Sequence, residues 1–316
     1  MTTAFIFPGQ GSQKAGMGRE LAEAFTSAAD VFAEVDEALG RKLSDIIFNG
    51  PDDVLTLTEN AQPALMAVSM AVVRVLENDF ALKVADHAAY LAGHSLGEYS
   101  ALCAAGCFSL ERTAGLLQTR GRAMQEAVPP GQGAMCAILG LELEAVEKVT
   151  GEAAADGETC EVANDNAPGQ VVVSGHAAAV ERAAEMAREA GAKRAVMLPV
   201  SAPFHCSLMA PAAEAMAAAL GEEAANPPAA PVVANYTARP ETSPQEVVDN
   251  LVRQVTGRVR WRESMAFMAG QGVDLFVELG AGKVLTGLVR RNAPGARGMA
   301  AGTPADIEKL AETLNG

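Results

Sequence analysis

Residues 88–105 read AAYLAGHSLGEYSALCAA: a short apolar run, a serine between two glycines, and an Ala-rich segment with helical spacing. The run at 88–92 predicts a core strand, and a helix is expected from about 96 to 105. Between them, Gly93-His94-Ser95-Leu96-Gly97 matches the G-x-S-x-G pattern, in which a sharp turn presents a nucleophilic serine. A plain glycine-rich turn with serine as a helix cap gives the same letters. The flanking strand and helix favour the nucleophile.

Strand and helix patterns alternate on both sides of this turn, which is typical of α/β proteins. We therefore predict a large α/β domain formed by residues 1–129 and 199–316. Its other strands are expected at 4–7, 232–236 and 275–278, and its other helices at 18–38, 61–78, 109–128, 207–220, 244–255 and, last, after Gly282.

Residues 130–198 carry a compact pattern of their own, which begins after a Pro- and Gly-rich turn. Four strands and two helices follow in the order β-α-β-β-α-β, the signature of a ferredoxin-like unit. We expect a ferredoxin-like small subdomain inserted into the large domain. Its strands are predicted at 134–139, 160–164, 170–174 and 195–200, and its helices at 142–150 and 177–190.

The composition excludes several classes of protein. The chain has 316 residues with 39 acidic and 24 basic side chains, so its net charge is −15 and nucleic acid is not an expected partner. No apolar run approaches the ~20 residues that cross a bilayer, and the first residues lack a secretory signal. Five cysteines indicate a reducing cytoplasm rather than a disulfide framework. Cys103 and Cys107 are expected on one helix face as buried thiols, not as metal ligands.

A serine nucleophile needs a base, and the chain has only four histidines. His94 adjoins the serine, so its ring should project away from the hydroxyl in a tight turn. His87 precedes the strand and is expected at its far end, whereas His176 falls in the small subdomain. His205 remains by elimination as the candidate base. A loop histidine with an ordinary partner would fit the same position.

Arg120 lies on the apolar side of the helix predicted at 109–128, between Leu116 and Met124. A guanidinium facing a core is costly unless it is paired. No acidic residue stands three or four positions away to pair with it. Arg120 therefore either forms a structural ion pair with a distant acid or clamps a substrate carboxylate. The residues alone leave both possibilities open.

The loop after the first strand reads Phe7-Pro8-Gly9-Gln10-Gly11-Ser12-Gln13. A dinucleotide-binding fingerprint would need a third glycine where Lys14 stands, so that interpretation is poor. A glycine-flanked Gln10 could bring a backbone N–H close to an active site as an oxyanion donor. An ordinary turn between strand and helix fits equally well.

Taken together, these motifs resemble the malonyl-CoA:acyl-carrier-protein transacylases of bacterial fatty acid synthesis and the acyltransferase domains of polyketide synthases. The likeness covers essentially the whole chain. The family fold is an α/β-hydrolase-like large domain with an inserted ferredoxin-like subdomain, in agreement with the pattern above. The segments that carry the resemblance are 7–13, 93–99, 118–121, 164–170, 202–205 and 251–254.

The resemblance implies a role for each matching residue. Ser95 would accept the acyl group, and His205 would act as its base. The main-chain carbonyl of Gln254 would orient the His205 ring in place of an acid. The backbone N–H groups of Gln10 and Leu96 would form the oxyanion hole.

The same resemblance implies the substrate contacts. Arg120 would hold the malonyl carboxylate, with Met124 beside it in the acyl pocket. Phe204 is similar to the residue of malonyl-selective members, in which its bulk would crowd an α-methyl branch. Ala202 and Pro203 differ from the residues that are commonest at these two positions in the family.

The expected partners are malonyl-CoA and the phosphopantetheine arm of acyl carrier protein, with no metal or other cofactor and a monomeric, cytoplasmic enzyme. Because carrier proteins are acidic, docking needs a local basic patch against the global charge. The candidates are Lys193, Arg194, Arg258, Arg260, Arg290 and Arg291.

Two rival functions fit parts of the pattern. A serine hydrolase or thioesterase would release free malonate, and its usual residue order needs an Asp between Ser95 and His205, where Asp156 and Asp165 stand. A non-catalytic acyl-CoA-binding module would not need the Ser95 hydroxyl.

Overall fold

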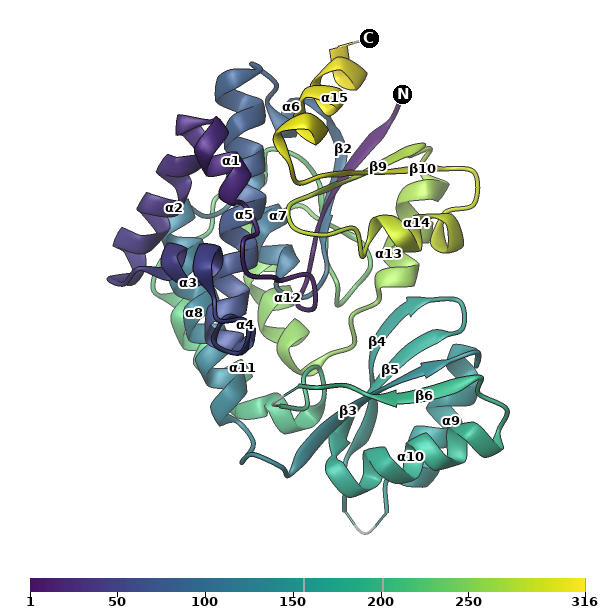
Figure 1. The fold of residues 1–316 in the computed structure, drawn as a ribbon. Coiled ribbons are helices and arrows are strands. Elements are labelled where there is room, and N and C mark those ends of the chain that lie inside the picture. The colour runs from purple at the N-terminus through teal and green to yellow at the C-terminus, as the bar shows by residue number, and fades with distance from the viewer. Residues whose placement is uncertain (156, 201, 316) are drawn as a thin grey trace.

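The computed structural model describes residues 1–155, 157–200 and 202–315, and it contains two sheets, one below the other in Figure 1. The larger sheet has the order β10-β9-β1-β2-β7-β8, in which only β8 is antiparallel to its neighbour. The predicted α/β class is confirmed. The strands of this sheet are β1 (Thr3–Phe7), β2 (Ala88–Gly93), β7 (Val232–Val233), β8 (Pro240–Glu241), β9 (Leu275–Leu279) and β10 (Arg297–Ala301).

Strand β1 lies in the middle of this sheet, and all of its residues are buried. Phe5 and Phe7 belong to the main core, together with α5 (Thr58–Asp79) and α7 (Gly97–Ala104). The alternate side chains, Ala4 and Ile6, belong to a second core with α13 (Trp261–Gly270). Helices on both faces thus explain why the strand is a continuous apolar run.

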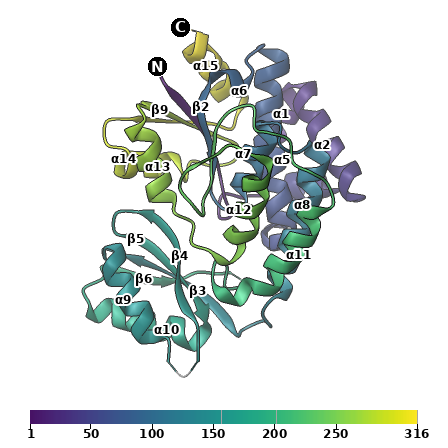
Figure 2. The same cartoon turned by 180° about the vertical axis from the view of Figure 1, so that it is seen from behind.

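The remaining helices of the large domain lie around this sheet or pack on α5 and its neighbours as a further layer, as the two opposite views show (Figures 1 and 2). They are α1 (Arg19–Ala24), α2 (Thr26–Leu39), α3 (Leu43–Asn49), α4 (Asp52–Thr56), α6 (Val84–His87), α8 (Leu110–Glu126), the 3-10 turn η1 (Ser207–Met209), α11 (Ala210–Gly221), α12 (Pro244–Thr256), α14 (Thr286–Asn292) and α15 (Pro304–Asn315).

The smaller sheet is antiparallel throughout, with the order β4-β5-β3-β6. Two amphipathic helices pack against it and share its separate core. The predicted β-α-β-β-α-β order is therefore present, whereas the domain boundaries at 130 and 198 stay a prediction. Its elements are β3 (Gly133–Leu139), α9 (Leu143–Ala153), β4 (Cys160–Ala167), β5 (Gln170–His176), α10 (Ala177–Glu189) and β6 (Arg194–Met197).

Several details of the sequence prediction are wrong. Residues 18–38 form two helices because Phe25 is extended, with φ −131° and ψ 123°. The helix after Gly282 is not the last element, since β10 and α15 follow α14. Cys103 and Cys107 do not share a helix face because α7 ends at Ala104, although both are buried free thiols.

The parallel strands direct the chain towards the space between the two sheets. Strand β1 starts near the N-terminus at the top of Figure 1 and runs down towards the smaller sheet. Strand β2 is parallel to it, so the loops after both strands emerge on the same side. Such carboxyl ends are where open α/β sheets place their ligands. No helix in the described part of the chain combines the length and apolarity that crossing a membrane requires.

Candidate active site

The serine turn joins β2 to α7 in the conformation that the glycine spacing predicts. Ser95 has φ 53°, a left-handed conformation that is unusual for a residue with a side chain. A Cβ on Gly93 would lie 1.8 Å from the Gly97 carbonyl oxygen, and a Cβ on Gly97 would lie 2.3 Å from that of Phe7. Glycine at both positions therefore lets the turn close against β1 and hold the Ser95 hydroxyl at its apex.

His205 is the residue that meets this hydroxyl. The Ser95 Oγ lies 2.7 Å from His205 Nε2, and His205 Nδ1 lies 2.9 Å from the main-chain oxygen of Gln254. A carbonyl only accepts, so Nδ1 carries the proton and Nε2 is free to accept one. Burial, reinforced by the positive charge of Arg120, lowers the pKa of His205 to about 3. The ring is therefore neutral, the form that a general base requires.

Arg120 projects from α8 into the same site and is 1% exposed. Its Nη2 donates to Ser95 Oγ at 3.1 Å and to Gln254 Oε1 at 2.9 Å, and its Nη1 donates to Gln62 Oε1 at 2.8 Å. Among the described residues it forms no ion pair, and its Nε has no partner. A buried charge held only by neutral groups is poised for an anionic ligand.

These groups open into one cavity of about 290 Å³. A larger hollow of about 590 Å³ is lined by the loop after β1 and by the segments after β9 and β10, but by no histidine. The smaller cavity is therefore the candidate active site. It brings together six of the predicted site residues: Gln10, Ser95, Arg120, Met124, Phe204 and His205.

Two backbone amides beside Ser95 are unused. Within the described residues, neither the Gln10 nor the Leu96 N–H donates a hydrogen bond, whereas the neighbouring Gly97 N–H donates to His94 O at 2.9 Å. Leu96 lies at the N-terminal end of α7, where the helix dipole favours negative charge. Both amides are available to an oxyanion, but their role stays a prediction.

The other histidines and candidate acids do not join the pair. His94 Nε2 lies 2.7 Å from Asn166 Oδ1, and His87 lies in α6, before β2 begins. Asp165 is paired with Arg262 through an Nε–Oδ2 distance of 2.8 Å. Asp156 lies outside the described residues.

Sequence reasoning missed three polar groups that hold this site. Gln62 binds Arg120 from the largely apolar helix α5, which also buries the amide of Asn60, so the pattern of the helix did not single Gln62 out. Asn235 lies just beyond β7, which ends at Val233 rather than at 236, and its side chain accepts from the Ser95 N–H at 2.7 Å. Glu98 binds both Asn235 and Gln254.

Comparison with known proteins now identifies the family. The acyl transferase domain family matches residues 4–303. The malonyl CoA-acyl carrier protein transacylase of Bacillus subtilis (strain 168) is 44% identical over 98% of this chain and 96% of its own. The acyl-carrier-protein S-malonyltransferase of Bartonella henselae has a structure with a TM-score of 0.97, 55% identity and full coverage of both chains.

A third relative was solved with its partner. It is a malonyl-transacylase in complex with its type II PKS acyl-carrier protein, with 42% identity, a TM-score of 0.95 and coverage of 99% of this chain and 100% of that one. These matches cover both sheets and all the residues that line the candidate active site. The chain belongs to the acyl transferase family and, within it, to the malonyl CoA–acyl carrier protein transacylases.

Proposed function

We propose that this chain is an acyl-carrier-protein S-malonyltransferase that moves a malonyl group from malonyl-CoA to the phosphopantetheine thiol of acyl carrier protein, for fatty acid biosynthesis. The observation that carries the proposal is the buried Arg120 guanidinium, 3.1 Å from the Ser95 hydroxyl and without an acid partner in the described chain. When a thioester carbonyl lies at Ser95, a carboxylate reaches that guanidinium only if the acyl group itself ends in a carboxylate, as malonyl does.

In the first half-reaction, Ser95 Oγ attacks the thioester carbonyl of malonyl-CoA while His205 Nε2 takes the hydroxyl proton. The carbonyl oxygen becomes an oxyanion on the Gln10 and Leu96 amides. The C–S bond then breaks, and CoA leaves as a thiol with the proton from His205. The product is a malonyl ester on Ser95.

In the second half-reaction, the phosphopantetheine thiol gives its proton to His205 as its sulfur attacks the Ser95 ester. The ester C–O bond breaks, and His205 returns the proton to Ser95 Oγ. Throughout, the pairing of Arg120 with the malonyl carboxylate orients the acyl group. Phe204 and Met124 line the pocket, where the bulk of Phe204 would crowd an α-methyl branch.

Product identity tests this function against the hydrolase rival. With holo acyl carrier protein present, the malonyl group should appear on the carrier as a thioester and not as free malonate. Release of free malonate with an unmodified carrier would instead make the chain a thioesterase.

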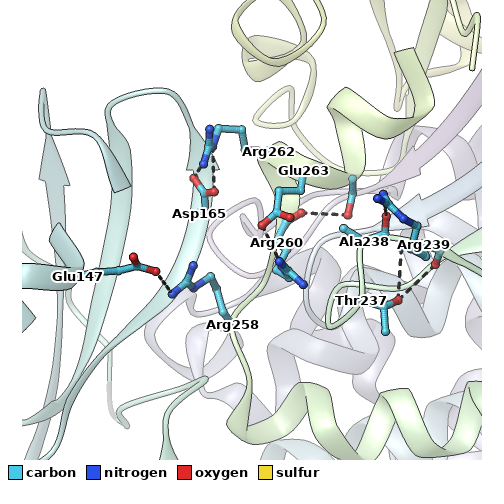
Figure 3. A network of polar contacts seen from close by, with 10 residues as sticks. Glu147, Asp165, Thr237, Ala238, Arg239, Arg258, Arg260, Arg262 and Glu263 are labelled. Atoms are coloured by element: carbon cyan, nitrogen blue, oxygen red, sulfur yellow. Dashed lines mark hydrogen bonds and ion pairs between the residues drawn. The ribbon is translucent and has the colours of Figure 1, made fainter. Parts of the chain in front are cut away.

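Two of the six candidate docking residues are already paired with acidic side chains. Arg258 is paired with Glu147 at 2.6 Å and Arg260 with Glu263 at 2.8 Å, as Figure 3 shows. The side chains of the other candidates have no acidic partner in the described chain. They are Lys193, Arg194, Arg290 and Arg291.

Hydrogen bonds connect α14, which carries Arg290 and Arg291, to the edge of the smaller sheet that carries Lys193 and Arg194, and we call this connected edge the rim. Arg291 donates to Pro168 O and to Gln170 Oε1 on the β4–β5 hairpin. Gly169 O on the same hairpin accepts from Gly140 N at 2.8 Å, and the adjacent Leu139 O, at the end of β3, accepts from Lys193 N at 2.8 Å. A rim of free positive charge on an acidic protein suits an acidic carrier.

Charge reversal tests this rim. Arg290→Glu and Lys193→Glu should each raise KM for the carrier about 3- to 10-fold, with KM for malonyl-CoA unchanged. Arg258→Glu is the matched control, because its charge is already neutralised by Glu147. An unchanged KM for the carrier in both rim variants would remove this surface from the proposal.

We also propose that the enzyme works as a monomer in the cytoplasm. All five cysteines are buried free thiols, which fits a reducing compartment. Size-exclusion chromatography with light scattering measures the oligomeric state directly.

A further inference from the structure

Glu98 is a fully buried carboxyl group immediately behind the active site, at the start of α7. Glutamate is almost never fully buried unless it is paired, yet no ion pair to Glu98 occurs in the described chain. Its Oε2 accepts from the Asn235 main-chain N–H at 2.9 Å and from Gln254 Nε2 at 2.8 Å. Its Oε1 has no partner among the described residues. One oxygen therefore carries all of its hydrogen bonds.

The two residues that bond to this oxygen, Asn235 and Gln254, also bond to the main chain of Ser95, one at its N–H and the other at its carbonyl oxygen. We call these two residues the clamps. Asn235 Oδ1 accepts from the Ser95 N–H at 2.7 Å, and Asn235 Nδ2 donates to Gly93 O at 2.6 Å. Gln254 Nε2 donates to Ser95 O at 3.0 Å. A left-handed residue persists only where its surroundings over-determine it. Glu98 accepts a hydrogen bond from each of these two residues, from the Asn235 main chain and from the Gln254 side chain.

Gln254 also contacts the base His205 and the cation Arg120. Its Oε1 accepts from Arg120, and its main-chain oxygen accepts from His205 Nδ1. A carboxylate can only accept, so an ionised Glu98 requires the Nε2 end of the Gln254 amide to face it. The Oε1 end then faces Arg120. An ionised Glu98, the Ser95 carbonyl oxygen and the Arg120 guanidinium therefore all favour the same orientation of the Gln254 amide.

The buried setting both opposes and supports a charge on Glu98, which is fully ionised only above neutral pH. Burial raises the pKa of Glu98 to about 7, while the bonds from Asn235 and Gln254 and the charge of Arg120 oppose that rise. Glu241 is a second buried glutamate close enough to interact with it, but Glu241 binds Asn250 and neither clamp.

We propose that Glu98 is a positioning residue for malonyl transfer: through Asn235 and Gln254 it holds the Ser95 main chain, the His205 ring and the Arg120 guanidinium in their reactive arrangement. The inference rests on the roles proposed above for Ser95 and His205. Glu98 itself touches neither substrate nor the reacting atoms.

The test is the Glu98→Gln variant, which keeps the shape and removes the charge. An amide replaces the two charge-assisted hydrogen bonds from Asn235 and Gln254 by weaker neutral ones. The rate of Ser95 acylation at saturating malonyl-CoA should fall about 10- to 100-fold. The half-saturating malonyl-CoA concentration should change by less than about threefold, and the unfolding temperature should not fall, because a buried charge is removed.

Glu241→Gln is the matched control and should acylate at the wild-type rate. Acylation by Glu98→Gln at the wild-type rate would overturn the proposal, as would a loss that merely follows a lower unfolding temperature. If Glu98→Gln does not fold, Asn235→Ala takes its place, and an unimpaired acylation rate in that variant is the overturning result. Ser95→Ala in the same assay tests the underlying function separately: acylation of that variant would refute the function itself, whatever Glu98 does.

Discussion

The Arg120→Ala variant is expected to lose malonyl transfer about 10²- to 10³-fold while acetyl transfer falls far less. The reason lies in the surroundings of the guanidinium, which is buried and held only by neutral groups in the described chain. A malonyl carboxylate gives it an opposite charge, whereas an acetyl group leaves it unpaired. Removing the cation therefore strips a contact that only the dicarboxylic acyl group makes.

The measurement is kcat/KM for malonyl-CoA and for acetyl-CoA in each variant. Because both substrates use one preparation, their ratio is insensitive to partial unfolding. Arg122→Ala is the matched control: Arg122 lies on the opposite, solvent side of α8 in an exposed pair with Glu59 and should leave the ratio unchanged. An equal loss for the two substrates would falsify the carboxylate clamp.

The His205→Ala variant is expected to form the malonyl ester about 10²- to 10⁴-fold more slowly. His205 Nε2 lies 2.7 Å from Ser95 Oγ and is the proton-accepting nitrogen, because Nδ1 donates to Gln254 O. Without the ring, the hydroxyl proton has no acceptor when the thioester is attacked. Stopped-flow release of CoA under single-turnover conditions measures this step.

His87→Ala is the control for that loss. His87 lies in α6, at the opposite end of β2 from the serine turn, so its removal should leave the acylation rate unchanged. If His205→Ala acylated as fast as His87→Ala, a different group would have to be the base.

The local parts of this site were predictable because short segments specify them. In Gly93-His94-Ser95-Leu96-Gly97 each glycine stands where another stretch of backbone, in the turn or in the adjacent strand, leaves no room for a Cβ. Arg120 could be identified because it places a positive charge on the apolar side of a predicted helix, and such a charge needs a partner. His205 emerged because only four histidines were available to serve as the base.

The supporting groups were not predictable because they come from distant segments and look ordinary in their own. Asn235 lay inside a segment expected to be strand, and nothing near it indicated that it would bind the Ser95 N–H, 140 positions earlier. Nothing around Gln62 pointed to Arg120. The role of Gln254 came from a family resemblance and not from its own pattern.

The break in the first long helix was unpredictable for a different reason. Apolar spacing continues through residues 18–38, and no proline or glycine marks the interruption at Phe25. The side chain of Phe25 packs edge-on against Phe80, with ring centroids 6.2 Å apart. The interruption at Phe25 thus coincides with a contact to a residue distant in sequence, which helical periodicity cannot predict.

The most direct test of the account is the intact mass of the protein after brief mixing with malonyl-CoA alone. Wild type should gain one malonyl group, lose it when holo acyl carrier protein is added, and Ser95→Ala should keep its unmodified mass. A wild-type protein that transfers malonyl without gaining mass, or a Ser95→Ala variant that gains the same group, would contradict the covalent Ser95 mechanism.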